Sequence, residues 1–383
     1  MLGLATALNS SSLKKKSVLT NKFSAELDGT GDYIDVSTLS SDIDKAAGTI
    51  SMWVKVQATS GNESFFNCSD GTSGDNKLVL MYNTGSAVIQ ANYKAGGSSQ
   101  DATHSIAGDD LTGLGWFHVA MTYNTSTPLI QLFLNGTRVA QRTSSLTQMS
   151  GDVAIDRVRL GSNANADNTY HHGNIDEFIY IAGKDLTESE MLLLYNNGKP
   201  DDIGDLPSAI YNAIKCWLRF GDGSIDGDAD QTSVIFDEKN ATLGSELVDN
   251  GNFATDSNWT KGTGWSIANG VASCDGTQSS TSNFSQGNTF DTPPQTLSDT
   301  YKITFDLVVT QGSITASSGS LSQSYTTSGS KILYGIPATG AGNLNFTAGS
   351  TFIGSIDNVS VKQVNGNPGF CVADATVGNS NVP

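Results

Sequence analysis

The sequence is short of cysteine and of charge, and each shortage excludes a class of protein. Its four cysteines are scattered over 383 residues without a C-x-x-C pair, which argues against a small disulfide scaffold and a cysteine-ligated zinc site. Charged residues make up only 15% of the chain, whereas disordered proteins carry much more charge. No apolar run is long enough to cross a bilayer as a helix, so we expect no membrane insertion.

Positive charge is scarcer than negative charge. The formal net charge is −17, with 21 lysines and arginines against 38 aspartates and glutamates. Such a chain repels phosphate backbones, and we therefore expect no nucleic-acid partner. We expect the four cysteines to remain free thiols, which suits assembly in a reducing cytoplasm.

In place of charge the chain has strand-like alternation and short polar turns. Apolar residues alternate in Thr49–Val56 and in Gly115–Tyr123, and Asn135-Gly136 between two apolar stretches is a strong hairpin signal. Thr187 and Glu190 form a capping box at the start of one short helix. The pattern predicts an all-β protein with two tandem antiparallel β-sandwiches (jelly rolls), a short capping helix and an acidic connector.

Changes in pattern divide the chain into five parts. A second alternating region surrounds Tyr301–Val309, and the stretch before it contains a short helix expected after Pro207 and an acidic turn. We expect an N-terminal arm at residues 1–22, a first sandwich at 23–200, a structured connector at 201–245, a second sandwich at 246–366 and a C-terminal tail at 367–383.

Two distant segments share one pattern around an aspartate. Gly173–Tyr180, GNIDEFIY, and Gly354–Val361, GSIDNVSV, both read Gly-x-Ile-Asp-x-apolar-x-apolar. Because side chains alternate along a strand, we predict that Asp176 shares a face with the two aromatic residues that follow it and that Glu177 lies on the opposite face. Carboxylates on opposite faces cannot flank one bond, which excludes a glycosidase-like pair from these two residues.

An aspartate at the start of an apolar face needs a partner for its charge. Backbone N–H groups of the turn or a bound cation can supply that partner. For Asp176 the cation would be a structural Ca²⁺, bound together with oxygens near Leu27–Tyr33, because carboxylate and carbonyl oxygens suit this hard ion. Asp357 occupies the same place in the second segment and is a further candidate, and both interpretations stay open for each residue.

The first half of the chain resembles a known family. Residues 23–198 are similar to the laminin G-like branch of the concanavalin A-like lectin/glucanase fold, through the stretches FSAELDGTGDYIDV, GTISMWVKV, GWFHVAMTYN and HHGNIDEFIYIAGKDLTESEMLLLYNNG. The resemblance implies that the strand of Asp176 closes the sandwich beside the first strand, with Asp176 and Asp28 as calcium ligands. The sequence has no counterpart of the E-x-D-x-x-E catalytic strand of the fold's glucanases, so we expect no enzyme activity.

The second half is similar to a carbohydrate-binding-module-like jelly roll. The similarity is carried by ELVDNGNFATDSNWTKGTGWSIANGVASCDG near its start and by FIGSIDNVSV near its end. Trp259 and Trp265 in the first of these stretches are candidates for a platform on which a sugar ring stacks. Packing in the core is the alternative, and it is the one we favour for Trp265.

A polar loop in the first half is another candidate for sugar binding. The loop SNANADNTYHH ends in Tyr170, His171 and His172, and sugar sites combine an aromatic ring with amide and carboxylate groups in this way. An ordinary solvated loop has the same composition, so this second interpretation stays open.

Two sandwiches without a catalytic constellation imply binding rather than chemistry. Proteins that join such domains resemble tailed-phage virion proteins, and we predict a non-catalytic virion structural protein in a head decoration, a tail fibre or another appendage. It would be made in the host cytoplasm, displayed on the virion surface, contact other virion proteins through the N-terminal arm, bind host-surface or environmental glycans and form a homo-oligomer. An extracellular bacterial adhesin is the alternative, and a polysaccharide-degrading enzyme is the second alternative.

Overall fold

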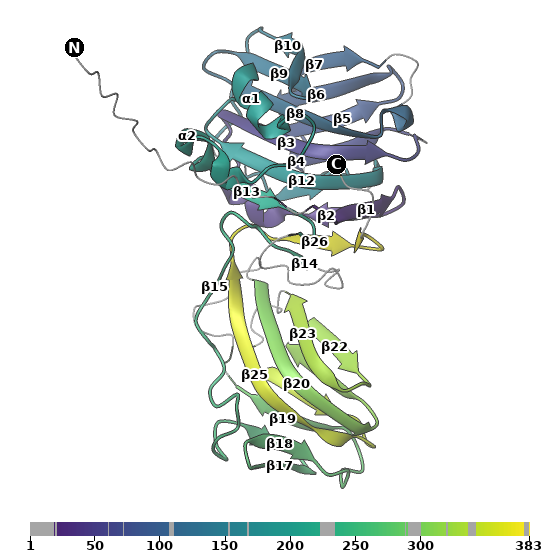
Figure 1. Ribbon diagram of the computed structural model, residues 1–383, viewed down its shortest axis with the longest axis vertical. Helices are drawn as coiled ribbons and strands as arrows, with labels where there is room; N and C mark the ends of the chain where they lie inside the picture. The colour runs from purple at the N-terminus through teal and green to yellow at the C-terminus, as the bar shows by residue number, and fades with distance from the viewer. Residues whose placement is uncertain are drawn as a thin grey trace, which may run out of the picture.

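The computed structural model consists of two β-sandwiches joined end to end (Figure 1). The strands pair antiparallel in both bodies, which confirms the predicted all-β class. The structure describes residues 19, 21–59, 61–71, 73–106, 111–151, 154–166, 168–222, 234–287, 289, 300–318, 321–335, 342–378 and 383.

The first sandwich, the upper body in Figure 1, has two eight-stranded sheets. We call them the helix-covered sheet and the open sheet. The helix-covered sheet contains, in spatial order, β10 (Thr137–Arg142), β9 (Leu129–Leu134), β8 (Trp116–Asn124), β3 (Ala47–Val56), β12 (His172–Ala182), β1 (Ser24–Asp28) and β27 (Thr376–Gly378), with β13 (Ile214–Leu218) paired to β12. The open sheet contains β14 (Val234–Ile235), β26 (Gly369–Val372), β2 (Tyr33–Asp35), β11 (Arg157–Leu160), β4 (Glu63–Ser69), β5 (Lys77–Asn83), β6 (Val88–Ala95) and β7 (Ser98–Ser105).

Apolar side chains from the inner faces of these two sheets form the main core. Along β3 the residues Ile50, Met52 and Val54 alternate into this core, as the sequence pattern predicts. The hairpin of β9 and β10 turns at Asn135 and Gly136, whose φ values are 48° and 77°. Two consecutive positive φ angles are those of a type I′ turn, which matches the strand twist and explains the Asn-Gly pair.

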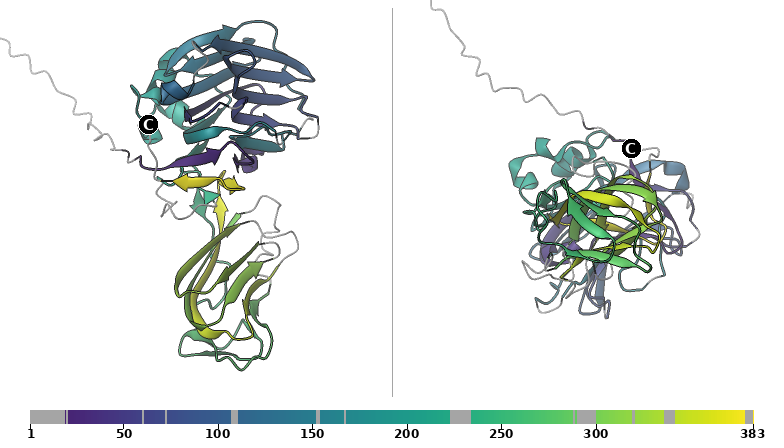
Figure 2. Two further views of the ribbon diagram at one scale, coloured as in Figure 1. Left: turned by 90° about the vertical axis from the view of Figure 1, so that its right-hand side faces the viewer. Right: turned by 90° about the horizontal axis from the view of Figure 1, so that it is seen from below.

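Helices lie on the outer side of the helix-covered sheet (Figure 2, left panel). The first, α1 (Glu188–Tyr195), begins with the predicted capping box, in which Thr187 and Glu190 each bond the backbone N–H of the other. α2 (Ser208–Tyr211), which starts after Pro207, and the 3-10 helix η4 (Ile203–Asp205) belong to the same layer. The described residues also form the 3-10 helices η1 (Ser37–Asp42), whose Leu39 lies in the main core, and η3 (Thr112–Leu114). None of the helices in the described residues has the length and apolarity needed to span a membrane.

A second apolar cluster binds this helical layer to the sheet. It includes Met191 and Leu194 of α1, Ile210 of α2, and Ile179 and Trp217 from the strands beneath them. The outer face of the helix-covered sheet is therefore partly occupied by packing.

The second sandwich, the lower body in Figure 1, has a six-stranded and a five-stranded sheet. The six-stranded sheet contains β17 (Trp265–Ala268), β18 (Val271–Cys274), β25 (Ile353–Asn365), β20 (Thr300–Gln311) and β23 (Gly329–Gly335), with β15 (Thr242–Leu243) paired to β25. The five-stranded sheet contains β16 (Thr260–Lys261), β19 (Ser282–Gln286), β24 (Leu344–Ala348), β21 (Ile314–Ser318) and β22 (Leu321–Tyr325). Phe305 and Phe346 from the two sheets meet edge to face in its core, at 4.9 Å between ring centroids.

The segment that the sequence suggested to be a tail, residues 367–383, returns to the first sandwich. β26 pairs with β2, with Cys371 opposite Ile34, and β27 pairs with β1, with Val377 opposite Ala25. Each sheet of the first sandwich therefore gains a strand from the end of the chain, and the second sandwich is an insertion between β14 and β26. Strands of three or four residues are too short for a sequence pattern to identify their partners.

A buried aspartate fixes the place where the chain leaves and re-enters the first sandwich. Asp237 accepts hydrogen bonds from the backbone N–H groups of Trp217 at 3.0 Å and Asn367 at 3.1 Å, and from the Asn240 side chain at 3.0 Å. Its side chain is fully buried, and burial raises the pKa of this carboxyl. One side chain thus joins β13, the outgoing turn and the returning segment.

Candidate functional site

The outer face of the open sheet carries a row of mostly polar side chains. In the register of the sheet, Arg159 lies opposite Asn67, Asn67 opposite Val79, Val79 opposite Asn92, and Asn92 opposite Asp101. Directly opposed residues of antiparallel strands project from the same face. The residues that alternate with this row belong to the core, so the row itself faces outward.

This face is hollowed into a cleft of about 150 Å³. Strands β4 to β7, which lie side by side in the upper body of Figure 1, supply most of its lining, and the loop between β11 and β12 supplies the rest. The lining residues are Ser64, Asn67, Lys77, Val79, Met81, Gln90, Asn92, Ser99, Asn163 and Thr169.

Three buried oxygens in the cleft wall have no donor. Ser64 Oγ, Asn67 Oδ1 and Asn92 Oδ1 form no hydrogen bond with any described residue. The three residues are only 1%, 3% and 5% exposed. A buried polar group without a partner costs about 1–3 kcal/mol, so each of these oxygens would be stabilised by a hydrogen-bond donor from outside the chain.

Asp101 orients the amide groups of the cleft. Its Oδ1 accepts from Gln90 Nε2 at 2.6 Å and from Asn92 Nδ2 at 2.5 Å. A carboxylate only accepts hydrogen bonds, so it holds the NH₂ ends of the two amides toward itself and turns their oxygens away. The amide oxygen of Asn92 is thereby fixed as an acceptor in the cleft wall.

Lys77 brings a positive charge to the same cleft. It is half-buried, and among the described residues its ammonium group has no hydrogen-bond partner. Burial lowers the pKa of Lys77, and the charge of Lys94 on the neighbouring strand lowers it further. Lys94 has partners of its own, since it donates to the Gly74 carbonyl at 2.9 Å and to Asp75 at 3.4 Å.

The structure overturns the ligand role predicted for His171. This side chain is fully buried, and its Nδ1 donates to the Glu63 carboxylate at 3.0 Å. The same carboxylate oxygen accepts the backbone N–H of His172 at 2.8 Å. His171 therefore fastens the end of the loop to β4 and is not accessible to a ligand.

Tyr170 and His172 do not line the cleft. Both are half-buried, and Tyr170 forms an isolated bridge with Ser162. The same loop does reach the cleft, but through Asn163 and Thr169. The loop therefore contributes to the site, but through residues other than the predicted Tyr170, His171 and His172.

Trp259, the other predicted ligand residue, is a core residue of the second sandwich. It is 7% exposed, and its ring stacks on Phe284 with 4.7 Å between centroids and an interplanar angle of 2°. Trp265, for which we favoured core packing, stacks on the same ring at 4.8 Å. The interpretation of Trp259 as a sugar platform is therefore wrong, because its face is already covered.

The predicted separation of Asp176 and Glu177 onto opposite faces is also wrong. Asp176 lies opposite Trp53 of β3, while Ile179 lies opposite Ser51, so β12 has one extra residue at this point. Such a β-bulge interrupts the alternation of side chains. Glu177 lies at the bulge with a φ of 48°, and both carboxylates project from the outer face of the helix-covered sheet.

Although they share a face, both carboxylates are engaged by protein donors. Asp176 is fully buried and accepts from the Asn21 side chain at 2.9 Å and from the Glu177 backbone N–H at 2.8 Å. Glu177 is 4% exposed and accepts from the Trp217 indole at 2.5 Å and the Arg219 guanidinium at 3.1 Å. The two groups do not open together onto one pocket, since Asp176 lines none of the described cavities.

Burial dominates the ionisation of this pair. It raises the pKa of Glu177 to about 7, against the opposing effect of the Arg219 charge. The pKa of Asp176 is raised well above its usual value, first by burial and then by the charge of Glu177. The charge of Asp222, whose carboxylate accepts the N–H groups of Lys22 and Phe23, acts in the same direction on both.

The three predicted calcium ligands do not come together. Asp28 lies opposite His172 in the pairing of β1 with β12, which places it about 13 Å along the strands from Asp176. Asp357 lies in the second sandwich, opposite Asp306. Among the described residues, no group of three or more His, Cys, Asp and Glu side chains could hold a metal ion.

Sequence reasoning does not identify the cleft residues on β4 to β7. A signal is present in VIQANYKA, where Gln90 and Asn92 alternate with core residues and so must face outward. Alternation within one strand does not reveal which strands are neighbours, and the site exists only because the register aligns Asn92 with Val79 and Asn67.

Comparison with known proteins bears on this first sandwich. Residues 28–191 match the family model of the concanavalin A-like lectin/glucanase superfamily, which confirms the resemblance over that stretch. The matched range contains every residue that lines the cleft. No curated protein matches the chain.

Solved structures are similar to part of the chain. The CBM40 domain of the Ruminococcus gnavus IT-sialidase is 18% identical with a TM-score of 0.38, and the match covers 48% of this chain and 100% of that one. Domain 4 of AbnA, an arabinanase from Geobacillus stearothermophilus solved with arabinotriose, is 18% identical with a TM-score of 0.36, covering 45% and 76%. A SAP-like pentraxin from Limulus polyphemus is 11% identical with a TM-score of 0.35, covering 48% and 88%.

Proposed function

We propose that this protein binds glycans without cleaving them, through the cleft on the open sheet. The observation that carries the proposal is the set of buried oxygens of Ser64, Asn67 and Asn92 that lack donors among the described residues. Sugar hydroxyls are donors, and a glycan in the cleft would supply the missing hydrogen bonds. The match to a superfamily of lectins and glucanases supports this use of the sheet.

The lining of the cleft supports binding in preference to hydrolysis. Glycosidases place two carboxyl groups on either side of the scissile bond, roughly 5–10 Å apart. The described residues that line this cleft include no aspartate or glutamate. The nearest carboxylate in the polar row, Asp101, is engaged by the amides of Gln90 and Asn92.

The test is a glycan array probed with the full-length protein, followed by calorimetric titration of the best ligand. Replacing both Asn67 and Asn92 by alanine should weaken binding at least tenfold, because each lost hydrogen bond contributes about 1 kcal/mol. Asn345→Ala, a half-buried amide on β24 of the second sandwich, is the matched control and should bind as wild type. The proposal fails if no glycan binds, or if the folded double variant binds as tightly as wild type.

We further propose a biological role: a tailed-phage virion protein that displays this site from a head decoration, fibre or other appendage. It is supported by the combination of a laminin G-like domain with a carbohydrate-binding-module-like sandwich, and by four cysteines that are all free, as suits assembly in a reducing cytoplasm. The arm that would contact other virion proteins, residues 1–22, lies outside the described residues except for Leu19, Asn21 and Lys22.

Mass spectrometry of purified phage particles tests this assignment. A virion protein should be recovered at a fixed ratio to the capsid protein, and native mass spectrometry should show the proposed homo-oligomer. Recovery from bacterial cell envelopes and not from particles would favour the adhesin assignment over the virion assignment. Shortening of a glycan during incubation with the purified protein would contradict the non-catalytic role and favour the polysaccharide-degrading enzyme.

A structural calcium ion at Asp176 is the remaining part of the proposal. The fit rests on Asn21, whose Nδ2 donates to Asp176 while its buried Oδ1 has no donor among the described residues. Asp222 adds negative charge at the same place, and carboxylate and amide oxygens suit Ca²⁺. Bound calcium would join the residues before β1 to β12, and neither Asp28 nor Asp357 would take part.

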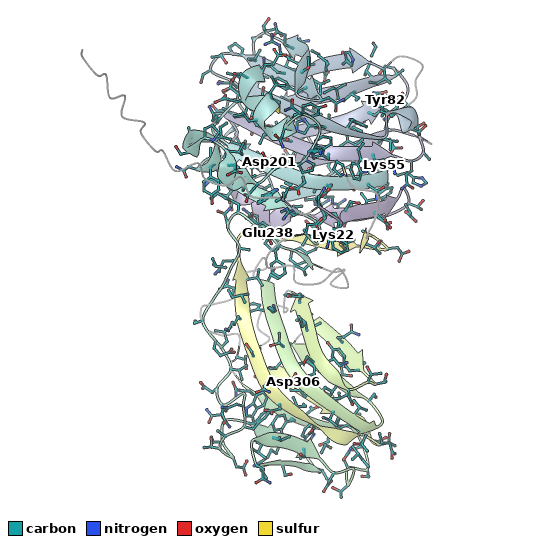
Figure 3. All side chains as sticks on the ribbon, in the orientation of Figure 1. Lys22, Lys55, Tyr82, Asp201, Glu238 and Asp306 are labelled. Carbon is teal, nitrogen blue, oxygen red and sulfur yellow. The ribbon has the colours of Figure 1, made fainter. Side chains whose placement is uncertain are left out.

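Thermal unfolding in millimolar calcium and in EDTA tests the ion. Calcium should raise the Tm of wild type and leave the Tm of Asp176→Asn unchanged, because ligand binding to the folded state alone stabilises it. Asp306→Asn on β20, labelled in Figure 3, is the control and should keep the wild-type response. A wild-type Tm that does not respond, or a response that survives in Asp176→Asn, contradicts the site.

A further inference from the structure

Lys77 lies on the outer face of the open sheet and forms no ion pair with any described residue. The register places it between Ser69 of β4 and Lys94 of β6. Its side chain lines the cleft and is half-buried, yet it has no hydrogen-bond partner in the part of the chain that the structure describes. A lysine that is partly desolvated without a partner is disfavoured in its charged form, and the lowered pKa of Lys77 has this cause.

Each neighbouring charged group already has hydrogen-bond partners other than Lys77. Lys94 donates to the Gly74 carbonyl and to Asp75. The Asp70 carboxylate accepts from Ser73 at 3.0 Å and from Asn76 at 2.9 Å. Asp101, as described above, accepts from two amides of the cleft. Asp70 and Asp101 act on Lys77 through their charges and oppose part of the lowering of its pKa, but neither forms a hydrogen-bonded ion pair with it among the described residues.

We propose that the cleft selects acidic sugars, with Lys77 binding a sugar carboxylate while Asn67 and Asn92 accept hydrogen bonds from neighbouring hydroxyl groups. The inference rests on the proposed glycan binding and adds the class of ligand. A carboxylate supplies the anion that the lysine lacks, in a charge-assisted hydrogen bond stronger than a neutral one. The unpartnered oxygens of the wall require hydroxyl donors beside that anion.

This combination distinguishes an acidic sugar from other anions. Inorganic phosphate or a phosphodiester chain presents mostly acceptor oxygens, which would face the oxygens of Asn67 and Asn92 without a proton between them. A uronic or other carboxylated sugar carries an anion and several hydroxyl donors on one ring. The cleft volume of about 150 Å³ is below the roughly 300–1,000 Å³ of sites that enclose larger ligands, so we expect it to take a single sugar unit.

Calorimetric titration of the full-length protein with matched probes tests the inference. The probes are trigalacturonate with its methyl-esterified form, and sialyllactose with its methyl ester, so that each pair differs only in the charge of its carboxylate. Wild type should bind at least one acid tenfold or more tightly than its neutral counterpart. Lys77→Met should lose this preference, and Lys77→Arg should restore most of it.

The control is Lys302→Met, which removes a half-buried lysine from β20 of the second sandwich and should leave the preference unchanged. Circular dichroism confirms that each variant is folded, and Lys77→Gln is the second variant if Lys77→Met is not. Binding of neutral and acidic probes with equal affinity by wild type, or a preference that survives in folded Lys77→Met or Lys77→Gln, overturns the inference and leaves the proposed function standing. If no probe binds and the glycan array is also empty, the proposed function fails with it.

Discussion

Glu177 and Asn358 occupy equivalent positions in the closing strands of the two sandwiches. Each follows the aspartate of a Gly-x-Ile-Asp motif, with φ of 48° at Glu177 and 50° at Asn358. The backbone N–H of each donates to Oδ1 of the preceding aspartate, at 2.8 Å and 2.7 Å respectively. The pairing register shifts at both places, so the motif encodes a β-bulge whose left-handed residue is stabilised by the side chain before it.

Replacing Asn358 by valine should destabilise the second sandwich by about 1–2 kcal/mol, because a β-branched residue is strained at this positive φ. Asn358→Gly should change stability by less than about 1 kcal/mol, since glycine adopts the conformation freely. Urea denaturation followed by tryptophan fluorescence measures both. Lys362→Val, on the same strand at a residue without positive φ, is the matched control. Equal losses in the two valine variants would show that the bulge has no special backbone requirement.

The same bulge shows where sequence reasoning about this fold succeeds and where it fails. Alternation predicts β3, β8 and β20 correctly, because each strand is long and its core-facing residues recur at every second position. At Glu177 one extra residue reverses the phase of the alternation, so a parity argument assigns the wrong face. The recurrence of Gly-x-Ile-Asp in two strands was a usable signal, and asparagine after the second aspartate, a residue enriched at positive φ, made it stronger.

Long-range strand pairing is the other feature of the fold that sequence reasoning does not predict. The cleft needs the alignment of four strands, and the last two strands of the first sandwich come from residues that follow the whole second sandwich. No local sequence pattern specifies which strands pair, since short strands have too few residues to define their partners. Local signals such as the Thr187 capping box and the Asn135-Gly136 turn are confirmed because they depend on adjacent residues only.

Removing the last strands should destabilise the first sandwich and not the second. A chain ending at Gly366 lacks β26 and β27, and with them the buried side chains of Ala375 and Val377 and the N–H of Asp374 that donates to Asp32 at 2.9 Å. We expect a loss of about 2–4 kcal/mol from the apolar burial and hydrogen bonds removed. Hydrogen exchange should show reduced protection in β1 and β2 with β20 unchanged, and a chain ending at Gly378 is the control. Unchanged protection in β1 and β2 would mean that the returning strands contribute nothing to stability.

The buried pair of Asp176 and Glu177 should make the folded state less stable as the pH rises from about 4.5 to about 7. The pKa of Glu177 rises from 4.5 in the unfolded chain to about 7 in the folded protein, so the folded state binds this proton more tightly. The resulting stabilisation is complete below pH 4.5 and is lost as the pH passes 7, and Asp176 shifts in the same direction.

Urea denaturation at a series of pH values, in EDTA, measures the slope of the free energy of unfolding against pH. Glu177→Gln should flatten it, with a difference from wild type of at most about 3 kcal/mol between the two ends of the range. Glu26→Gln on the neighbouring strand β1 should keep the wild-type slope. A slope that is unchanged in Glu177→Gln would place the titrating group elsewhere, with Asp237 as the next buried carboxyl whose pKa is raised.

Asp101 should act on binding through the amides that it orients, although it does not line the cleft. In Asp101→Leu the NH₂ end of Asn92 keeps only its longer bond to the Gln100 carbonyl, at 3.4 Å, so its oxygen no longer points into the cleft wall in every molecule. We expect about a tenfold loss of affinity for the best glycan with the preference for acidic sugars retained, because Lys77 is still present and loses only the nearby negative charge of Asp101. Asp101→Asn keeps one acceptor oxygen and should lose less. Thr103→Leu, two residues along the same strand, is the control, and equal affinity in Asp101→Leu and Thr103→Leu would show that amide orientation does not govern binding.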